Sequence, residues 1–167
     1  MINSIILNAE EVRGLLYGSL SRIVREVKGL EPGDLFIGPD WYESVKVDSY
    51  GELYAGPSVF CISDENGEWS IKSPFSSPGT VLYVRETFAE IDGCGFIIGA
   101  CINGKDKVVY KVDAPDNLYA KWQSPATMPL WASRFSIVNK SVTVEQIDGV
   151  WCWVMDAGVV EIGAGGE

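Results

Sequence analysis

The chain contains no histidine among its 167 residues. Histidine is the general base of Ser-His-Asp and Cys-His active sites, a common metal ligand, and the side chain that titrates near neutral pH. Its absence excludes these two kinds of nucleophilic catalysis, histidine-ligated metals and histidine pH switches.

Cysteine is scarce, and its four residues stand far apart: Cys61, Cys94, Cys101 and Cys152. Six residues separate the nearest pair, whereas zinc knuckles use about two to four. We favour buried free thiols, because unpaired cysteine is among the most buried residue types. A thiolate zinc site or a disulfide is the alternative, and the favoured interpretation needs no metal and no cofactor.

Long apolar runs are also missing. No stretch approaches the roughly 18 apolar residues that a membrane-spanning helix needs. The short run at residues 5–7 lacks the preceding basic region of a signal peptide. We therefore expect a cytoplasmic protein, in the host cell if the gene is viral, with no membrane contact. The length fits one domain with a sizeable core, and 47% apolar against 22% charged residues is a globular composition.

Basic residues are few, with 13 Lys and Arg against 23 Asp and Glu and a net charge of −10. Proteins that bind the duplex phosphate backbone normally show the opposite balance, so extended duplex binding is disfavoured while a local basic pocket is not. The acidity could simply keep the protein soluble. It could also mimic nucleic acid and occupy a basic groove on another protein.

What the sequence does contain is one short helix followed by many short strands. Asn8 is placed to cap the helix with Glu11 in a capping box, and Gly18 can close it. Segments rich in β-branched and aromatic residues then predict ten strands: residues 23–27, 35–37, 58–63, 68–71, 81–84, 96–102, 107–112, 135–138, 142–146 and 150–155.

Turn residues organise these strands. Asn66-Gly67 and Asn103-Gly104 lie between apolar runs and predict two hairpins. Many short strands at this spacing favour a mainly β (α+β) fold with a closed or nearly closed small β-barrel. We expect a single domain over residues 1–156 and a flexible Gly-rich C-terminal tail over residues 157–167.

Two segments place an arginine among aromatic residues at a strand edge: residues 82–88 read LYVRETF, and residues 124–134 read SPATMPLWASR. Since successive strand side chains face opposite ways, Arg85 and Glu86 should point to different sides. A buried Glu86 paired with arginine would be a structural clamp, which we favour, whereas an unpaired one could be a general base. Trp131 could stack a base beside Ser133 or Arg134, although filling the barrel end is the favoured role.

These two segments resemble the signature blocks of the ASCH-domain proteins, PUA-like small β-barrels often encoded by phages and prophages. Further similarity lies at residues 16–25, where the family has a basic turn after its helix, and at residues 150–156, which read VWCWVMD like the family's last strand. Residues 71–75 and 144–148 also match family blocks. The resemblance implies a PUA-like barrel with a short N-terminal helix.

Departures from the family indicate lost chemistry. Family members with known chemistry are amidohydrolases of N4-acetylcytidine that use a Lys and a Thr after the helix together with a Glu on a later strand. Leu20 and Ile23 occupy the first two positions here, while Glu86 matches the third. Leu and Ile can be neither base nor nucleophile, and nothing in the sequence supplies a base for Ser21. A tight hairpin at Asp148-Gly149 replaces the insertion that often roofs the family's pocket.

The resemblance therefore implies a non-catalytic phage or prophage module that binds a nucleotide or short single-stranded RNA. The expected ligand-binding residues are Arg25, Arg85, Glu86, Trp131, Ser133 and Arg134. One alternative is an acidic inhibitor that occupies the basic channel of a host defence nuclease. The other is a residual amidohydrolase that depends on Glu86. The protein could be a monomer or a homodimer.

Overall fold

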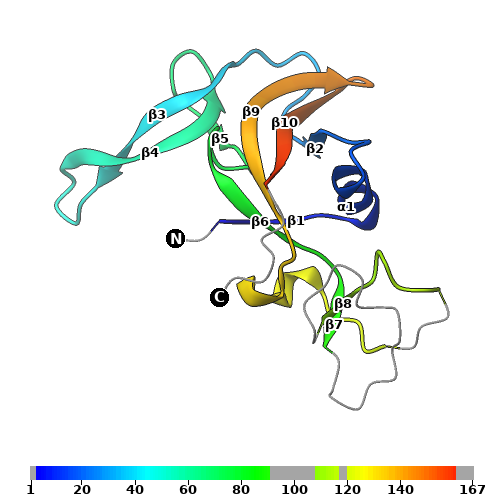
Figure 1. Cartoon of the computed structure of the whole chain (residues 1–167). Helices are drawn as coiled ribbons and strands as arrows, with labels where there is room; N and C mark the ends of the chain where they lie inside the picture. Colours follow the sequence, from blue (N-terminus) through cyan, green and yellow to red (C-terminus); the bar gives the residue numbers. More distant parts are fainter. Residues whose placement is uncertain (1–2, 91–107, 117–119, 161–167) are drawn as a thin grey trace.

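The computed structural model describes residues 3–90, 108–116 and 120–160. As predicted, the fold is mainly β with one α-helix (Figure 1). The elements follow in this order: β1 (Ser4–Ile6), α1 (Ala9–Leu16), β2 (Arg22–Glu26), β3 (Ile37–Val47), β4 (Leu53–Ser63), β5 (Ser70–Lys72), β6 (Val81–Arg85), β7 (Phe88–Glu90), β8 (Val108–Tyr110), the 3-10 turns Pro125–Thr127 and Leu130–Ala132, β9 (Ser136–Ile147) and β10 (Val150–Val160). In the described part of the chain, no helix is long and apolar enough to cross a membrane.

The predicted capping box begins helix α1. Asn8 Oδ1 accepts a 2.9 Å hydrogen bond from the Glu11 backbone N–H, and the Asn8 N–H donates to Glu11 Oε2 at 3.0 Å. These bonds satisfy backbone donors that the first helical turn leaves without partners. Gly18 follows the helix with φ +74°, which confirms the predicted end. The helix buries Val12 and Leu15 in the core.

The main sheet has five strands in the order β1-β6-β9-β10-β2. Its longest pairing is the antiparallel β9–β10 hairpin, which confirms the tight connection predicted at Asp148-Gly149. Both turn residues have positive φ, at 51° and 81°, which is the geometry of a type I′ turn. Strand β1, which the sequence analysis did not predict, runs parallel to β6.

Strand pairing does not close the expected barrel within the described residues. Strands β1 and β2 are the two edges of the five-stranded sheet. They nevertheless lie near each other, as a 3.2 Å hydrogen bond from Arg25 Nη2 on β2 to the Ile6 carbonyl on β1 shows. An arginine side chain thus spans the gap where a strand ladder would complete a barrel.

Strands β3 and β4 form a long hairpin that extends away from the five-stranded sheet (Figure 1). Strand β5 pairs with the base of β4, and the connecting turn at Gly67, with φ +70°, confirms the predicted Asn66-Gly67 hairpin. The predicted strand at 58–63 lies within β4, whereas the prediction at 35–37 meets β3 only at Ile37. The outer part of this arm is exposed on both faces, so the alternation of Val45 and Val47 with Ser44 and Lys46 has no buried side to mark it as a strand.

Two further differences from prediction concern β9 and β10. The predicted strands 135–138 and 142–146 are one strand, β9, because the intervening Asn139 is fully buried and its side chain donates to the Phe75 carbonyl at 3.2 Å. The predicted tail also begins too early. Ala157–Val160 continue β10 past a β-bulge and pair with the start of β9, and Ala157 is buried.

The remaining strand predictions fall partly outside the described residues, which include neither the strand at 96–102 nor the Asn103-Gly104 hairpin. The prediction at 107–112 corresponds to β8, which pairs with β7. Cys61 and Cys152 are buried free thiols, as expected, and burial raises the pKa of both. Cys94 and Cys101 lie outside the described residues.

Candidate functional site

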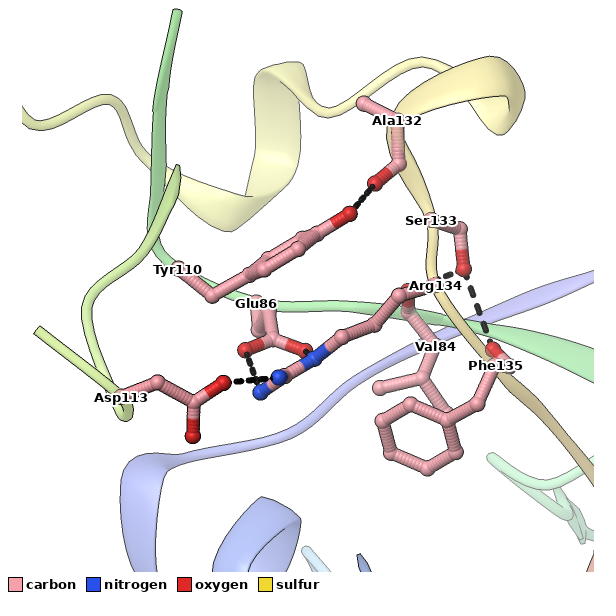
Figure 2. A network of polar contacts seen from close by, with 8 residues as sticks. All are labelled: Val84, Glu86, Tyr110, Asp113, Ala132, Ser133, Arg134 and Phe135. Carbon is pink, nitrogen blue, oxygen red and sulfur yellow. Dashed lines mark hydrogen bonds and ion pairs between the residues drawn. The ribbon is translucent and has the colours of Figure 1, made fainter. Parts of the chain in front are cut away.

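A buried ion pair joins the two arginine-bearing segments singled out in the sequence. Arg134 Nη2 and Nε donate to the two carboxylate oxygens of Glu86 at 2.8 Å and 3.0 Å (Figure 2). The side chains are only 3% and 2% exposed. Such a two-pronged pair fixes both groups geometrically. It confirms the interpretation of Glu86 as a structural clamp, in which both carboxylate oxygens are occupied.

Two further residues complete this network, and neither was predicted. Asp113, just after β8, accepts from Arg134 Nη1. The Tyr110 ring lies over the guanidinium, with 4.3 Å from the ring centroid to Arg134 Cζ, and its hydroxyl donates to the Ala132 carbonyl at 2.7 Å (Figure 2). Their contacts join residues far apart in sequence, so no local motif could have revealed them.

The network keeps Arg134 positively charged. Burial lowers the pKa of Arg134, but the hydrogen bond and charge of Glu86 and the charge of Asp113 outweigh this effect and raise the pKa overall. Burial also raises the pKa of Glu86, while Arg134 acts in the opposite direction. A ligand could reach Arg134 only by displacing one of these carboxylates.

Ser133 and Trp131 are placed differently from each other. Ser133 Oγ lies 2.8 Å from the Val84 carbonyl and 3.0 Å from the Phe135 carbonyl, so its hydroxyl bonds the backbone between β6 and β9. Trp131 is 49% exposed on the second 3-10 turn, so it does not fill a closed barrel end. No described contact joins Trp131 to Arg134, although the two are three residues apart.

A second candidate site lies where Arg85 points. Glu86 is buried in the network just described, while Arg85 lines a separate cavity of about 590 Å³. This confirms that the two neighbouring side chains point to different sides. The cavity is lined by Ser4, Ile5, Ile6, Arg25, Glu26, Lys28, Ile71, Lys72, Pro74, Phe75, Arg85 and Trp153. We call this cavity the basic pocket.

Four cations of the basic pocket come from four places in the chain. Arg25 lies on β2, Lys28 just after it, Lys72 at the end of β5, and Arg85 at the end of β6. They make up four of the thirteen Lys and Arg residues of an acidic chain. Glu26 is the one carboxylate in the lining.

Arg25 is the anchored cation of the pocket. Its Nη1 and Nη2 donate to Glu11 Oε1 and Oε2 at 2.5 Å and 3.1 Å, and it also bonds the Val24 and Ile6 carbonyls. Glu11 is the residue that closes the capping box of α1. The helix start and the pocket wall are therefore coupled through one carboxylate.

The other three cations of the pocket have no carboxylate partner of this kind among the described residues. Lys28, Lys72 and Arg85 form no ion pair with any described residue, and the buried Arg85 Nε–H has no acceptor there. Lys28 and Lys72 were missed by the sequence analysis. Lys28 lies just after β2 and Lys72 ends β5, and only the three-dimensional arrangement brings them to Arg25 and Arg85.

The structure thus divides the six predicted ligand-binding residues. Arg25 and Arg85 share the basic pocket, Glu86 and Arg134 share the buried clamp, and the other two lie elsewhere. Among the described residues, no cluster of acidic or thiol side chains could hold a metal ion. Comparisons with protein-family models, with curated proteins and with solved structures find no match to the chain.

Proposed function

We propose that this protein is a non-catalytic binding module for a nucleotide or a short single-stranded RNA, built on the ASCH-like scaffold that its motifs resemble. The observation that carries the proposal is the convergence of four cations on one pocket in a chain of net charge −10. Such a pocket attracts phosphate locally. The acidity of the rest of the chain disfavours a duplex, which needs an extended basic surface.

The apolar part of the pocket lining supports a nucleoside as part of the ligand. Ile5, Phe75 and Trp153 line the cavity and belong to the main hydrophobic core. Small-molecule sites typically combine an apolar lining with a few charged groups that orient the ligand. A lining that combines apolar side chains with cations suits a flat base attached to a phosphate.

The arrangement favours binding over hydrolysis. Glu86, which matches the family's catalytic carboxylate, has both oxygens bonded to Arg134 and does not line the pocket. The pocket itself offers one hydroxyl, Ser4, and one carboxylate, Glu26, and no described hydrogen bond joins them. A serine without a base is a poor nucleophile. These features count against the residual amidohydrolase.

The proposal is tested by calorimetric titration of the full chain with adenosine and uridine monophosphates and with 5′-phosphorylated hexamers of each. Lys72→Glu places a carboxylate in the pocket, and we expect it to weaken binding at least tenfold, about the effect of one charge-assisted hydrogen bond. Lys46→Glu, on the β3–β4 arm, makes the same change in net charge and serves as the matched control. Absence of binding by the wild type, or equal weakening by both variants, would refute the proposal.

One observation favours a second candidate, an acidic protein that binds a basic partner. The outer part of the β3–β4 arm exposes Val45, Val47 and Leu53 at 64%, 61% and 72%. Val47 pairs with Leu53, so their side chains share one face of the hairpin. The arm also carries Asp40, Glu43, Asp48 and Glu52 against a single Lys46. An apolar groove rimmed by Lys and Arg, as in a nuclease channel, would match this arm.

This candidate is tested with a photo-crosslinking residue at Val47, followed by reconstitution of the captured protein with the purified chain. We expect the affinity to fall steeply between low and high salt. Leu53→Lys should abolish binding, whereas Lys140→Glu, on β9, should leave binding unchanged. Capture of a second copy of this chain alone would contradict the candidate.

A further inference from the structure

We propose that the basic pocket recognises the terminal phosphate monoester of its ligand in preference to the internal diesters of an RNA chain. The inference rests on the proposed function and names the chemical group that the site selects. It starts from the charge balance. Four cations, less Glu26 in the lining and Glu11 on Arg25, leave a local charge of +2. A phosphate monoester carries about −1.5 to −2 at neutral pH, whereas an internal diester carries about −1.

The arrangement of donors points the same way. Lys28 and Arg25 approach from the β2 side, and Lys72 and Arg85 from the ends of β5 and β6. Grooves that follow a nucleic-acid backbone spread their cations along the strand direction. Here the cations line one cavity. A group with three terminal oxygens can accept from several sides at once, which an internal diester with two free oxygens does less well.

Arg85 supplies an independent indication. Its Nε–H is buried and has no acceptor among the described residues. The Arg85 guanidinium lines the cavity and forms no ion pair with a described residue, so an anion in the pocket gains a charge-assisted bond that the free protein lacks. Arginine suits this task because its planar fork matches phosphate oxygens in pairs.

The test compares three uridine hexamers that differ only at their ends, carrying a 5′-phosphate, a 3′-phosphate or two hydroxyls, with inorganic phosphate as a fourth probe. We expect the full chain to bind one phosphorylated hexamer at least tenfold more tightly than the unphosphorylated one. Lys72→Gln should reduce that ratio, and Lys46→Gln should leave it unchanged. Lys72 is exposed, so its replacement leaves the fold intact.

A second readout uses the titration of the ligand. The second pKa of a phosphate monoester lies near about 6, so the phosphorylated hexamer should bind more tightly at pH 7.5 than at pH 5.5. The unphosphorylated hexamer should not change. The titratable lining consists of Arg25, Lys28, Lys72, Arg85 and Glu26, and the chain has no histidine, so a step near this pH belongs to the ligand.

The outcomes separate the two proposals. Equal binding of all three hexamers overturns the terminal-phosphate inference and leaves the proposed function standing. Failure of every hexamer and of the nucleoside monophosphates to bind overturns both. Inorganic phosphate that binds as tightly as the phosphorylated hexamers supports selection of the phosphate but overturns a nucleotide as the ligand.

Discussion

At Arg134, one guanidinium holds together three parts of the chain: the end of β6 through Glu86, the segment after β8 through Asp113, and the entry to β9. Buried ion pairs often add little net stability, because desolvation offsets the attraction, yet removing one partner leaves the other charge buried alone. Arg134 therefore determines where these segments lie more than how stable the fold is.

Replacing Arg134 with Met should destabilise the protein by about 3–5 kcal/mol, because two carboxylates then face each other without a counter-charge. Urea unfolding measures the loss. Arg22→Met breaks the exposed pair with Glu145, whose side chains are 48% and 44% exposed, and should cost no more than about 1 kcal/mol. Similar losses in the two variants would show that the buried pair has no special role.

The cost of Arg134→Met should also depend on pH. Without the arginine, burial and Asp113 remain as causes that raise the pKa of Glu86. A carboxyl with a folded-state pKa above its unfolded value binds more protons when folded, so stability falls as the pH rises between the two values. The variant should therefore lose stability relative to the wild type as the pH rises from 4.5, the ordinary pKa of a glutamate, towards neutral. A constant difference across this range would contradict the assignment.

At the scale of elements, the β9–β10 hairpin depends on its two-residue turn. Gly149 has φ +81°, and no atom lies within 4 Å of the place that a Cβ would take, so only backbone conformation opposes a side chain there. Gly149→Ala should cost about 1–2 kcal/mol in thermal or urea unfolding. Gly33→Ala, at an open position without positive φ, is the matched control and should be close to neutral. Equal effects of the two would refute the conformational explanation.

The elements that the sequence predicted well are those with a local cause. The capping box of α1, the Asn66-Gly67 turn and the Asp148-Gly149 turn follow from side-chain chemistry within a few residues. Strand β1 and the outer arm of β3 and β4 did not follow. The first has only three residues, and the second is exposed on both faces, so burial does not mark it as a strand.

The candidate site shows the same division. Opposite orientations of Arg85 and Glu86 follow from strand geometry, so sequence reasoning could predict them. The choice of Arg134 as the partner of Glu86 and the gathering of Lys28 and Lys72 around Arg85 depend on contacts between distant segments. Sequence could not distinguish the residues of the clamp from those of the pocket, and it assigned both to one site.

At the scale of the whole molecule, the β3–β4 arm and the body should contribute differently to stability. Val47→Lys changes an exposed side chain on the arm and should alter the free energy of unfolding by no more than about 0.5 kcal/mol. Ile137→Ala empties a fully buried position on β9 and should cost about 2–5 kcal/mol. A large loss from Val47→Lys would mean that another part of the molecule, or another copy, covers the arm.

The Arg25 bridge between β1 and β2 creates a seam, the edge between these two strands, which should open locally more often than the rest of the sheet. Where a strand ladder would open only by breaking several backbone bonds together, this seam is spanned by a side-chain bond from Arg25 to the Ile6 carbonyl. Local opening should begin there, so the backbone amides of β2 should exchange with deuterium faster than those of the doubly paired β10. A phosphate bound to Arg25 should slow that exchange, so that an occupied pocket would suppress the local opening of β1 from β2.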